Sequence, residues 1–349
     1  MKSVISYILI LLSFLSCGDE YEDIASQILP ETEEVSLEIL VDRSDVIWGF
    51  DFLPDQQIIF TERAGQIFIF NPQTKVTTPV TGVPEVAAGG EGGLLDLRLH
   101  PDFRNNKEVY FCYTEGAPGG RTQSLGRAEL QGTSLINQER IFTAGNPNSA
   151  PNHFGCRIEF SGNNQLFLTI GDQADGNLAQ DPNVFQGKII RLNTDGPNVE
   201  IFSSGHRNPQ GLTTHPTTGV LYSSEHGPVG GDELNIITQG SNYGWPLVTQ
   251  GRSAPGFVDP IIHWSPAIAP SGIIFYTGNQ IPQWQGNLFI ATLRGEHIRR
   301  LVVSGDKVLE EELIFENFGI RFRTLRTGPD GFLYVSTDDG RIGKITPVQ

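Results

Sequence analysis

Three polar clusters in this chain combine residue types that can move protons and hold charge. They cover residues 152–157 (NHFGCR), 205–211 (GHRNPQG) and 225–233 (EHGPVGGDE). His153, in the first cluster, has the side chain best suited to general-base chemistry, because a neutral imidazole has a pKa near the pH at which enzymes work. The same cluster also fits a simpler interpretation, in which His153 is a hydrogen-bonded loop residue. Residue types alone leave both interpretations open.

Charged pairs elsewhere have two interpretations as well. Arg321 and Arg323 alternate along a strand-like stretch, where they could bind an anion or merely form surface charge. Asp232 and Glu233 could hold a hard cation such as Ca²⁺, or lie in a turn as solvated acids.

The elements that position these clusters are expected to be strands. The chain has 349 residues, with 40 Gly and 22 Pro, so turns are frequent and long helices are not expected to dominate. Hydrophobic residues make up 38% and charged residues 18%, which fits a globular protein with a substantial core. This length suits two domains or one large β domain.

A repeated unit favours the single β domain. Each copy has a strand, a turn rich in Pro, Asp, Asn or Gly, and a second strand of β-branched and aromatic residues. The turns begin near residues 54, 101, 161, 216, 282 and 329. Six copies without helical periodicity between them predict an all-β fold, a six-bladed β-propeller with four-stranded antiparallel blades. We place it at residues 37–349, with a stack of β-sandwiches as the alternative.

The chemistry is expected at one mouth of the propeller channel, where loops between strands converge. The longest predicted loops, expected to line that mouth, cover residues 113–152, 173–186, 223–232 and 243–268.

The chain is acidic, with 24 Lys and Arg against 40 Asp and Glu and a net charge of −16. A nucleic-acid-binding protein usually carries a basic surface, so this balance argues against that class.

The first residues predict export. Residues 1–16 carry one Lys and a short apolar run, which is typical of a signal peptide and too short to span a bilayer as a stable helix. Cys17 follows and resembles the lipidated residue of a bacterial lipoprotein; an ordinary secretory signal is the alternative. Residues 17–36 are rich in acids and are expected to form a solvated tether. We therefore expect an outer-membrane lipoprotein that faces the periplasm or the exterior.

Two cysteines remain beyond Cys17. Cys112 and Cys156 lie in apolar, strand-like contexts. Export permits a disulfide, but two cysteines make no disulfide framework, and we predict two buried thiols.

Taken together in their order, the polar clusters resemble a known family. The three clusters, with residues 242–246 (NYGWP), are similar to the soluble, pyrroloquinoline-quinone (PQQ) dependent aldose sugar dehydrogenases of the glucose/sorbosone dehydrogenase family. The resemblance extends from about residue 46 to residue 347. It implies oxidation of aldoses at the anomeric carbon to lactones, with electrons passed on to an external acceptor.

The resemblance also implies roles for individual residues. His153 matches the catalytic base, Asp172 the carboxylate that orients it, and Arg207 the cation beside the quinone oxygen. The cofactor would further contact Asn208, Arg294, Arg321 and Arg323. One Ca²⁺ is expected at the backbone carbonyls of Gly227 and Pro228, and a second at Glu233 with the backbone of Tyr243.

Two residues depart from the family pattern. Glu91 stands where the family typically has a cofactor-contacting Gln, and a carboxylate there would repel an anionic cofactor unless it is protonated or paired. Cys156 replaces a residue that is usually small.

Two other functions are compatible with a propeller. One is a cell-surface binding propeller that has lost turnover, which Glu91 favours. The other is a calcium-dependent lactonase-like hydrolase, which would need an acid-rich metal centre and has no use for Arg207, Arg321 and Arg323. The expected assembly is a monomer or homodimer.

Overall fold

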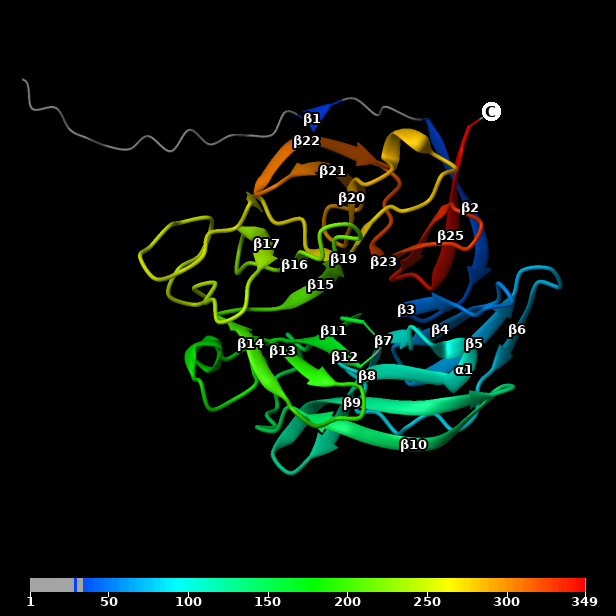
Figure 1. Cartoon of the computed structure of the whole chain (residues 1–349), viewed down its shortest axis with the longest axis horizontal. Helices are drawn as coiled ribbons and strands as arrows, with labels where there is room; N and C mark the ends of the chain where they lie inside the picture. The colour runs from blue at the N-terminus through cyan, green and yellow to red at the C-terminus, as the bar shows by residue number, and fades with distance from the viewer. Residues whose placement is uncertain (1–27, 30–33, 163, 349) are drawn as a thin grey trace, which may run out of the picture.

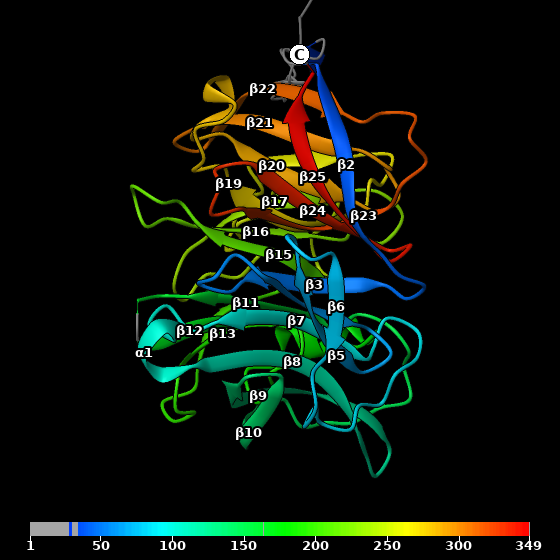
Figure 2. The ribbon, with the colours of Figure 1, turned by 90° about the vertical axis from the view of Figure 1, so that its right-hand side faces the viewer.

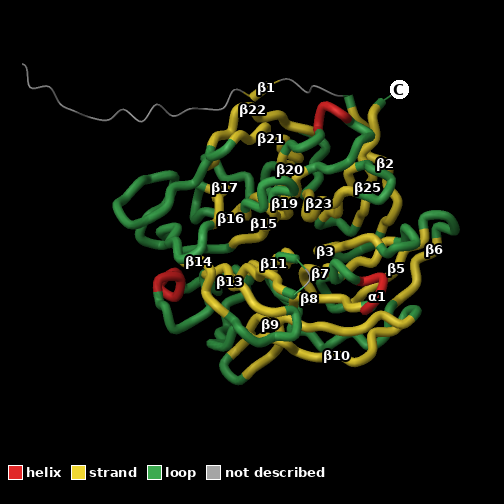
Figure 3. Tube along the Cα trace, in the orientation of Figure 1, coloured by secondary structure: helices red, strands yellow, loops and turns green. Residues whose placement is uncertain are grey.

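The computed structural model describes residues 28–29, 34–162 and 164–348, and these consist almost wholly of strands and loops (Figure 3). The expected signal at residues 1–16 and Cys17 lie outside the described residues. The helical elements within the described part are α1 (Phe103–Asn106) and two 3-10 turns, η1 (Gly176–Gln180) and η2 (Pro282–Trp284). No helix in these residues is long and apolar enough to cross a membrane.

Six antiparallel four-stranded sheets surround a central axis (Figure 1). The innermost strand of each sheet contacts the innermost strand of the next, and the last contacts the first, which closes a ring. This confirms the predicted six-bladed β-propeller, and the alternative of stacked β-sandwiches is wrong.

Each blade consists of consecutive strands, with the exception of the last. Blade 1 contains β3 (Ile47–Phe52), β4 (Ile58–Glu62), β5 (Gln66–Asn71) and β6 (Val76–Pro79). Blade 2 contains β7 (Leu94–Leu99), β8 (Glu108–Ala117), β9 (Gly120–Gln131) and β10 (Ser134–Thr143). Blade 3 contains β11 (Gly155–Phe160), β12 (Gln165–Ile170), β13 (Lys188–Asn193) and β14 (Glu200–Ser204).

The second half of the ring follows the same plan. Blade 4 contains β15 (Pro209–Thr214), β16 (Leu221–Glu225), β17 (Asp232–Ile237) and β18 (Ile262–Trp264). Blade 5 contains β19 (Pro270–Phe275), β20 (Leu288–Thr292), β21 (Ile298–Ser304) and β22 (Lys307–Ile314). Blade 6 contains β23 (Phe322–Thr327), β24 (Leu333–Thr337), β25 (Arg341–Pro347) and the N-terminal strand β2 (Val35–Asp42).

The two ends of the chain close the ring together. The strand β2 pairs antiparallel with β25 along nearly its whole length, so the outer strand of blade 6 comes from the N-terminus (Figure 2). The strand begins two residues before the predicted boundary at residue 37. A two-residue strand, β1 (Ile28–Leu29), pairs parallel with β22, so this part of the expected tether has regular structure.

The predicted turns all lie between the first and second strands of a blade. One predicted mouth loop is wrong: residues 113–152 are mostly the long strands β8, β9 and β10. At 10, 12 and 10 residues these are the longest strands in the described part of the chain, and they occupy most of the range expected to be a loop.

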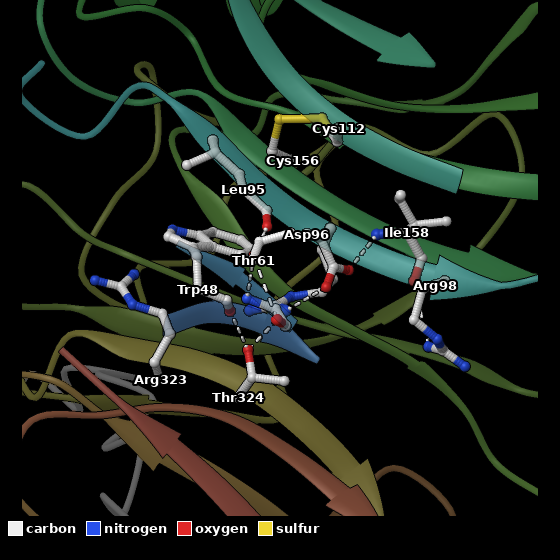
Figure 4. Close-up of polar contacts among 12 residues, drawn as sticks. Trp48, Thr61, Leu95, Asp96, Arg98, Cys112, Cys156, Ile158, Arg323 and Thr324 are labelled. Atoms are coloured by element: carbon white, nitrogen blue, oxygen red, sulfur yellow. Dashed lines mark hydrogen bonds and ion pairs between the residues drawn. A yellow bond between two sulfur atoms is a disulfide. The ribbon is translucent and has the colours of Figure 1, made fainter. Parts of the chain in front are cut away.

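The innermost strands share an irregularity near their mouth-side end. In all six, the pairing with the second strand shifts register there, as at a β-bulge. A bulge changes the direction of side chains, and here polar and aromatic side chains occupy the channel. The Arg157 guanidinium lies 4.2 Å from the Trp48 ring centroid and donates to Asp96. Figure 4 shows Trp48, Asp96 and Arg323 within this filled channel.

Cys112 and Cys156 form a disulfide, so the prediction of two buried thiols is wrong. The two residues lie 44 positions apart in the sequence, in β8 of blade 2 and β11 of blade 3. They meet because the innermost strand of blade 3 packs against β8.

Candidate active site

The fold brings the predicted site residues to one mouth of the channel. Because adjacent strands alternate in direction, two kinds of connection meet at the same face: from one blade to the next, and from the second to the third strand within a blade. The first kind carries Glu91, His153, Arg207, Asn208 and Arg321; the second carries Asp172, Gly227, Pro228 and Arg294. Arg323 follows at the start of β23, Glu233 lies in β17, and Tyr243 lies in the connection from β17 to β18.

His153 and Asp172 form a hydrogen-bonded pair. His153 Nδ1 lies 2.7 Å from Asp172 Oδ1, and Trp245 Nε1 donates to Asp172 Oδ2 at 2.8 Å. The Asp172 side chain is 1% exposed and that of His153 is 14% exposed. The carboxylate therefore fixes one ring nitrogen, while Nε2 of this partly exposed ring has no hydrogen-bond partner among the described residues.

The backbone around His153 is held from three blades. Glu91 Oε2 of blade 2 accepts a hydrogen bond from the His153 N–H at 2.8 Å and from Asn208 Nδ2 at 3.1 Å. Asn208 Oδ1, from the blade 4 side, accepts from the Gly155 N–H at 3.1 Å. A Cβ at Gly171 would lie 2.0 Å from the His153 carbonyl oxygen, so this close approach requires glycine. The Glu91 carboxylate is therefore paired, since it accepts hydrogen bonds from the His153 N–H and from Asn208.

Arg207 lies beside these residues. Its guanidinium lies 5.3 Å from the Trp245 ring centroid and donates to the His226 carbonyl at 3.2 Å. Burial lowers the pKa of Arg207, while Asp172 and Glu91 oppose that shift. An arginine keeps its charge under these conditions, so the mouth holds a cation close to the His153–Asp172 pair.

Two further arginines share one carboxylate. Arg323 donates to both oxygens of Asp338, at 2.7 and 2.9 Å, and Arg321 donates to Oδ2 at 3.0 Å. Although burial alone would raise the pKa of Asp338, Arg323 and Arg321 hold it below the usual value. Arg323 is 5% exposed, so the interpretation as plain surface charge is wrong for it. Arg294 is exposed at the same mouth.

His226 lies at the site although no role was predicted for it within the cluster at residues 225–233. His226 Nε2 is buried and has no hydrogen-bond partner. Burial, with Arg323 and Arg207, lowers the pKa of His226, against the influence of Asp232 and Glu91. Only burial reveals such an unpaired nitrogen, and no sequence signal reports it.

All four predicted metal positions border one cavity of about 20 Å³. They are Gly227, Pro228, Glu233 and Tyr243, and Glu225 lines it too. This volume suffices for one water-sized body. Burial, and next the charge of Glu225, raises the pKa of Glu233 to about 8. Paired carboxylates of this kind suit a hard cation.

The cavity differs from a side-chain metal cluster. No group of three or more His, Cys, Asp or Glu side chains converges as a metal site in the described part of the chain. Asp232 is 1% exposed and accepts from the N–H groups of Gly227, Ile268 and Ala269, all at 2.7 Å. The interpretation of Asp232 as a solvated turn acid is therefore wrong.

Known proteins resemble this chain over most of its length. A sequence model of the family described as Glucose / Sorbosone dehydrogenase matches residues 44–345. The Aldose sugar dehydrogenase YliI of Escherichia coli (strain K12) is 36% identical over 345 residues, which covers 90% of this chain and 93% of that protein.

Solved structures agree with the sequence match. The apo-form of the soluble aldose sugar dehydrogenase (Asd) from Escherichia coli superposes with a TM-score of 0.86 at 35% identity, over 90% of this chain and 100% of that chain. The PQQ-bound form of Aldose Sugar Dehydrogenase (Adh) from Streptomyces coelicolor gives a TM-score of 0.78 at 29% identity, over 90% and 98%.

Proposed function

This chain belongs to the glucose/sorbosone dehydrogenase family, and we propose that it is a PQQ-dependent sugar oxidoreductase that oxidises aldoses at the anomeric carbon to lactones. The observation that carries the proposal is the His153 imidazole, bound to Asp172 through Nδ1 and open at Nε2, in a mouth that also holds Arg207.

Proton transfer in this proposal uses His153 Nε2, the ring nitrogen that has no hydrogen-bond partner among the described residues. His153 Nε2 accepts the proton of the anomeric hydroxyl, and Asp172 holds the other nitrogen and stabilises the imidazolium that forms. Trp245 and the Ala174 N–H in turn fix the carboxylate of Asp172. The base therefore needs no reorientation when the proton moves.

The residues at the mouth suit PQQ, the cofactor bound in the related Aldose Sugar Dehydrogenase (Adh) from Streptomyces coelicolor. When bound, PQQ supplies an ortho-quinone that accepts the two electrons of the oxidation. Arg321, Arg323 and Arg294 would bind its carboxylates, and Arg207 would stabilise negative charge at the quinone oxygen. The unpaired, buried His226 Nε2 supports this fit, because such an atom needs a polar partner.

Of the two predicted calcium ions, one is proposed at the single cavity that Pro228 and Glu233 both border. Carboxylate and carbonyl oxygens are the ligands that Ca²⁺ prefers, and the cavity accommodates one ion. A cation there would offset the repulsion between Glu225 and Glu233 and stabilise the loop beside Arg207.

The alternatives have less support. The case for a binding propeller rested on Glu91, whose carboxylate is engaged by the His153 N–H and Asn208. The lactonase-like hydrolase needs an acid-rich metal centre, and no such cluster occurs in the residues described.

The test is dye-linked oxidation of an aldose panel by the full chain in detergent, with PQQ and Ca²⁺, and PQQ titration in parallel. We expect turnover that needs PQQ, and weaker PQQ binding in Arg321→Ala. Arg140→Ala is the matched control, because that arginine forms only a surface ion pair with Glu115 in blade 2. PQQ binding without turnover of any aldose would favour the binding propeller.

We also infer that the chain is an exported lipoprotein of the outer membrane. The Cys112–Cys156 disulfide supports an oxidising compartment. Labelling cells with palmitate and fractionating their membranes tests this. Label that persists in Cys17→Ser would contradict lipidation at Cys17.

A further inference from the structure

The Cys112–Cys156 disulfide involves a residue three positions after the proposed base. Cys156 follows His153 by three residues, and its side chain crosses to β8 of the neighbouring blade. Both cysteines are 0% exposed, in the hydrophobic cluster that fills the space between blades 2 and 3. Cys156 is the second residue of the inner strand β11, and Figure 4 shows the bond that joins it to Cys112. The covalent link thus joins β11, which begins two residues after the base, to a strand of another sheet.

The segment between His153 and Cys156 has an unusual backbone. His153, Gly155 and Cys156 have φ values of 64°, 62° and 73°. Residues with a Cβ rarely adopt positive φ, because the side chain then crowds the backbone. Cysteine at position 156 is therefore conformationally costly. The disulfide is a function of this side chain that glycine could not provide.

Noncovalent contacts hold the same blade interface. Gln123 Nε2 of β9 donates to the Thr169 carbonyl of β12 at 2.9 Å and contacts Cys112 Sγ at 3.4 Å. The Glu91 carboxylate binds the His153 N–H from the same blade. Two unbonded sulfurs require a greater separation than two bonded ones, and this buried cluster is closely packed. Loss of the bond would therefore push Cys156, and with it the His153 segment, away from blade 2.

We propose that the Cys112–Cys156 disulfide is a positioning device for His153, so that turnover requires the two cysteines to be oxidised. The inference rests on the proposed function, because it concerns the same base. Formation of the bond removes one proton and one electron from each thiol and creates the S–S bond. The two electrons and two protons pass to a disulfide donor, such as oxidised glutathione, which becomes two thiols.

The experiment compares the oxidised full chain with Cys112→Ser/Cys156→Ser and Cys112→Ser/Cys156→Gly. We expect kcat to fall roughly 10- to 100-fold in the serine pair, since a small misplacement of a catalytic group has effects of this order. KM for the aldose and the Kd for PQQ should stay within about twofold. Glycine tolerates positive φ, so the glycine variant should recover part of the lost kcat, which a purely stabilising crosslink would not produce.

A second readout separates this inference from the proposed function. Long-range ¹⁵N NMR of the histidine rings, without cofactor, reports the His153–Asp172 hydrogen bond directly. We expect the His153 signals to shift in the serine pair and to return towards wild type in the glycine variant. This holds even if the wild-type chain oxidises no aldose, which would refute the function alone.

Unchanged His153 signals and a kcat within twofold of wild type, with only a lower unfolding temperature, would overturn the proposal. If the serine pair does not fold, the folded wild-type chain is treated with a phosphine, which becomes the phosphine oxide as water supplies the thiol protons. Free thiols are counted by mass after alkylation. Turnover that stays constant as the reduced fraction rises would equally overturn the proposal.

Discussion

Blades 3 and 4 carry the same pair of side chains in the same places. In each, a histidine in the connection that enters the blade contacts, through Nδ1, a carboxylate nineteen residues later. The distances are 2.7 Å for His153 with Asp172 and 2.9 Å for His206 with Glu225. The propeller repeat therefore supplies two histidine–carboxylate pairs, and neither the spacing nor the hydrogen bond distinguishes them.

The second ring nitrogen distinguishes the two pairs. His206 is 0% exposed, its Nε2 lies 2.8 Å from Ser203 Oγ, and its ring stacks on Tyr243 with centroids 4.8 Å apart. His153 is 14% exposed, and its Nε2 has no hydrogen-bond partner in the described residues. A histidine–carboxylate pair thus becomes a candidate base only where its other nitrogen can reach a substrate; elsewhere it fastens the fold.

The largest expected loss of kcat comes from removing the His153 side chain. His153→Ala should lower kcat roughly 10²- to 10⁴-fold, the usual contribution of a general base. PQQ affinity and the unfolding temperature should change little, because the ring is bound to the fold only through Asp172. Steady-state kinetics and a PQQ titration measure both.

A histidine at the opposite face serves as the control for this variant. His215 lies in the turn between β15 and β16, where its ring packs against Phe275. His215→Ala should retain wild-type kcat. Comparable losses in the two variants would mean that the His153 effect reflects folding and not proton transfer.

A smaller loss is expected when the orienting carboxylate becomes an amide. In Asp172→Asn, one amide oxygen cannot accept from both Trp245 Nε1 and His153 Nδ1 as the two carboxylate oxygens do. If the amide donates to Nδ1, the ring carries its proton on Nε2 and cannot act as the base. We expect kcat to fall roughly 10- to 10³-fold with KM nearly unchanged. A kcat equal to wild type would remove Asp172 from the proposed mechanism.

Removing His206 from its pair with Glu225 should lower the stability of the fold and leave the turnover rate nearly unchanged. His206→Ala leaves a cavity beside Tyr243 and removes the partner of the buried Ser203 hydroxyl, while Glu225 Oε1 keeps only its bond from Asn235 Nδ2. We expect the free energy of unfolding to fall by about 2–4 kcal/mol. At temperatures well below the transition, kcat should stay within a few-fold of wild type. Denaturant unfolding and kinetics on the same preparation test the comparison, and a large selective loss of kcat would reverse the roles of the two histidines.

Calcium removal should lower the unfolding temperature, because the proposed ion lies beside Glu225, the partner of His206. Glu225 contacts His206 and also borders the proposed cation cavity with Glu233. An ion bound only to the folded state stabilises it by about 2.7 kcal/mol at 100 times its Kd. Chelation should therefore lower the unfolding temperature, and added Ca²⁺ should restore it. An unfolding temperature that does not depend on calcium, in wild type and in Glu233→Gln alike, would exclude an ion from this cavity.

The sequence predicts the fold because six turns repeat at visible intervals, and each turn joins the first two strands of a blade. It predicts the position of His153 through resemblance, since the spacing to Asp172 recurs unchanged between His206 and Glu225. It does not predict the Cys112–Cys156 disulfide, because that pairing depends on the register between two separate sheets. The unpaired nitrogen of His226 is equally hidden, since the burial of a single atom depends on how the folded chain packs around it.

The smallest effect is expected from removing the Ser203 hydroxyl, the hydrogen-bond partner that His206 Nε2 has and that His153 Nε2 lacks among the described residues. Ser203→Ala removes the partner of His206 Nε2 and leaves the contact with Glu225 intact. A buried hydrogen bond contributes about 1 kcal/mol, so the free energy of unfolding should fall by about that amount, with kcat unchanged. Combined with His206→Ala, the loss should be less than the sum, because both changes remove the same hydrogen bond. Strictly additive losses in this double-mutant cycle would show that the Ser203 hydroxyl does not hold His206 closed, and that burial alone keeps this second histidine from reacting.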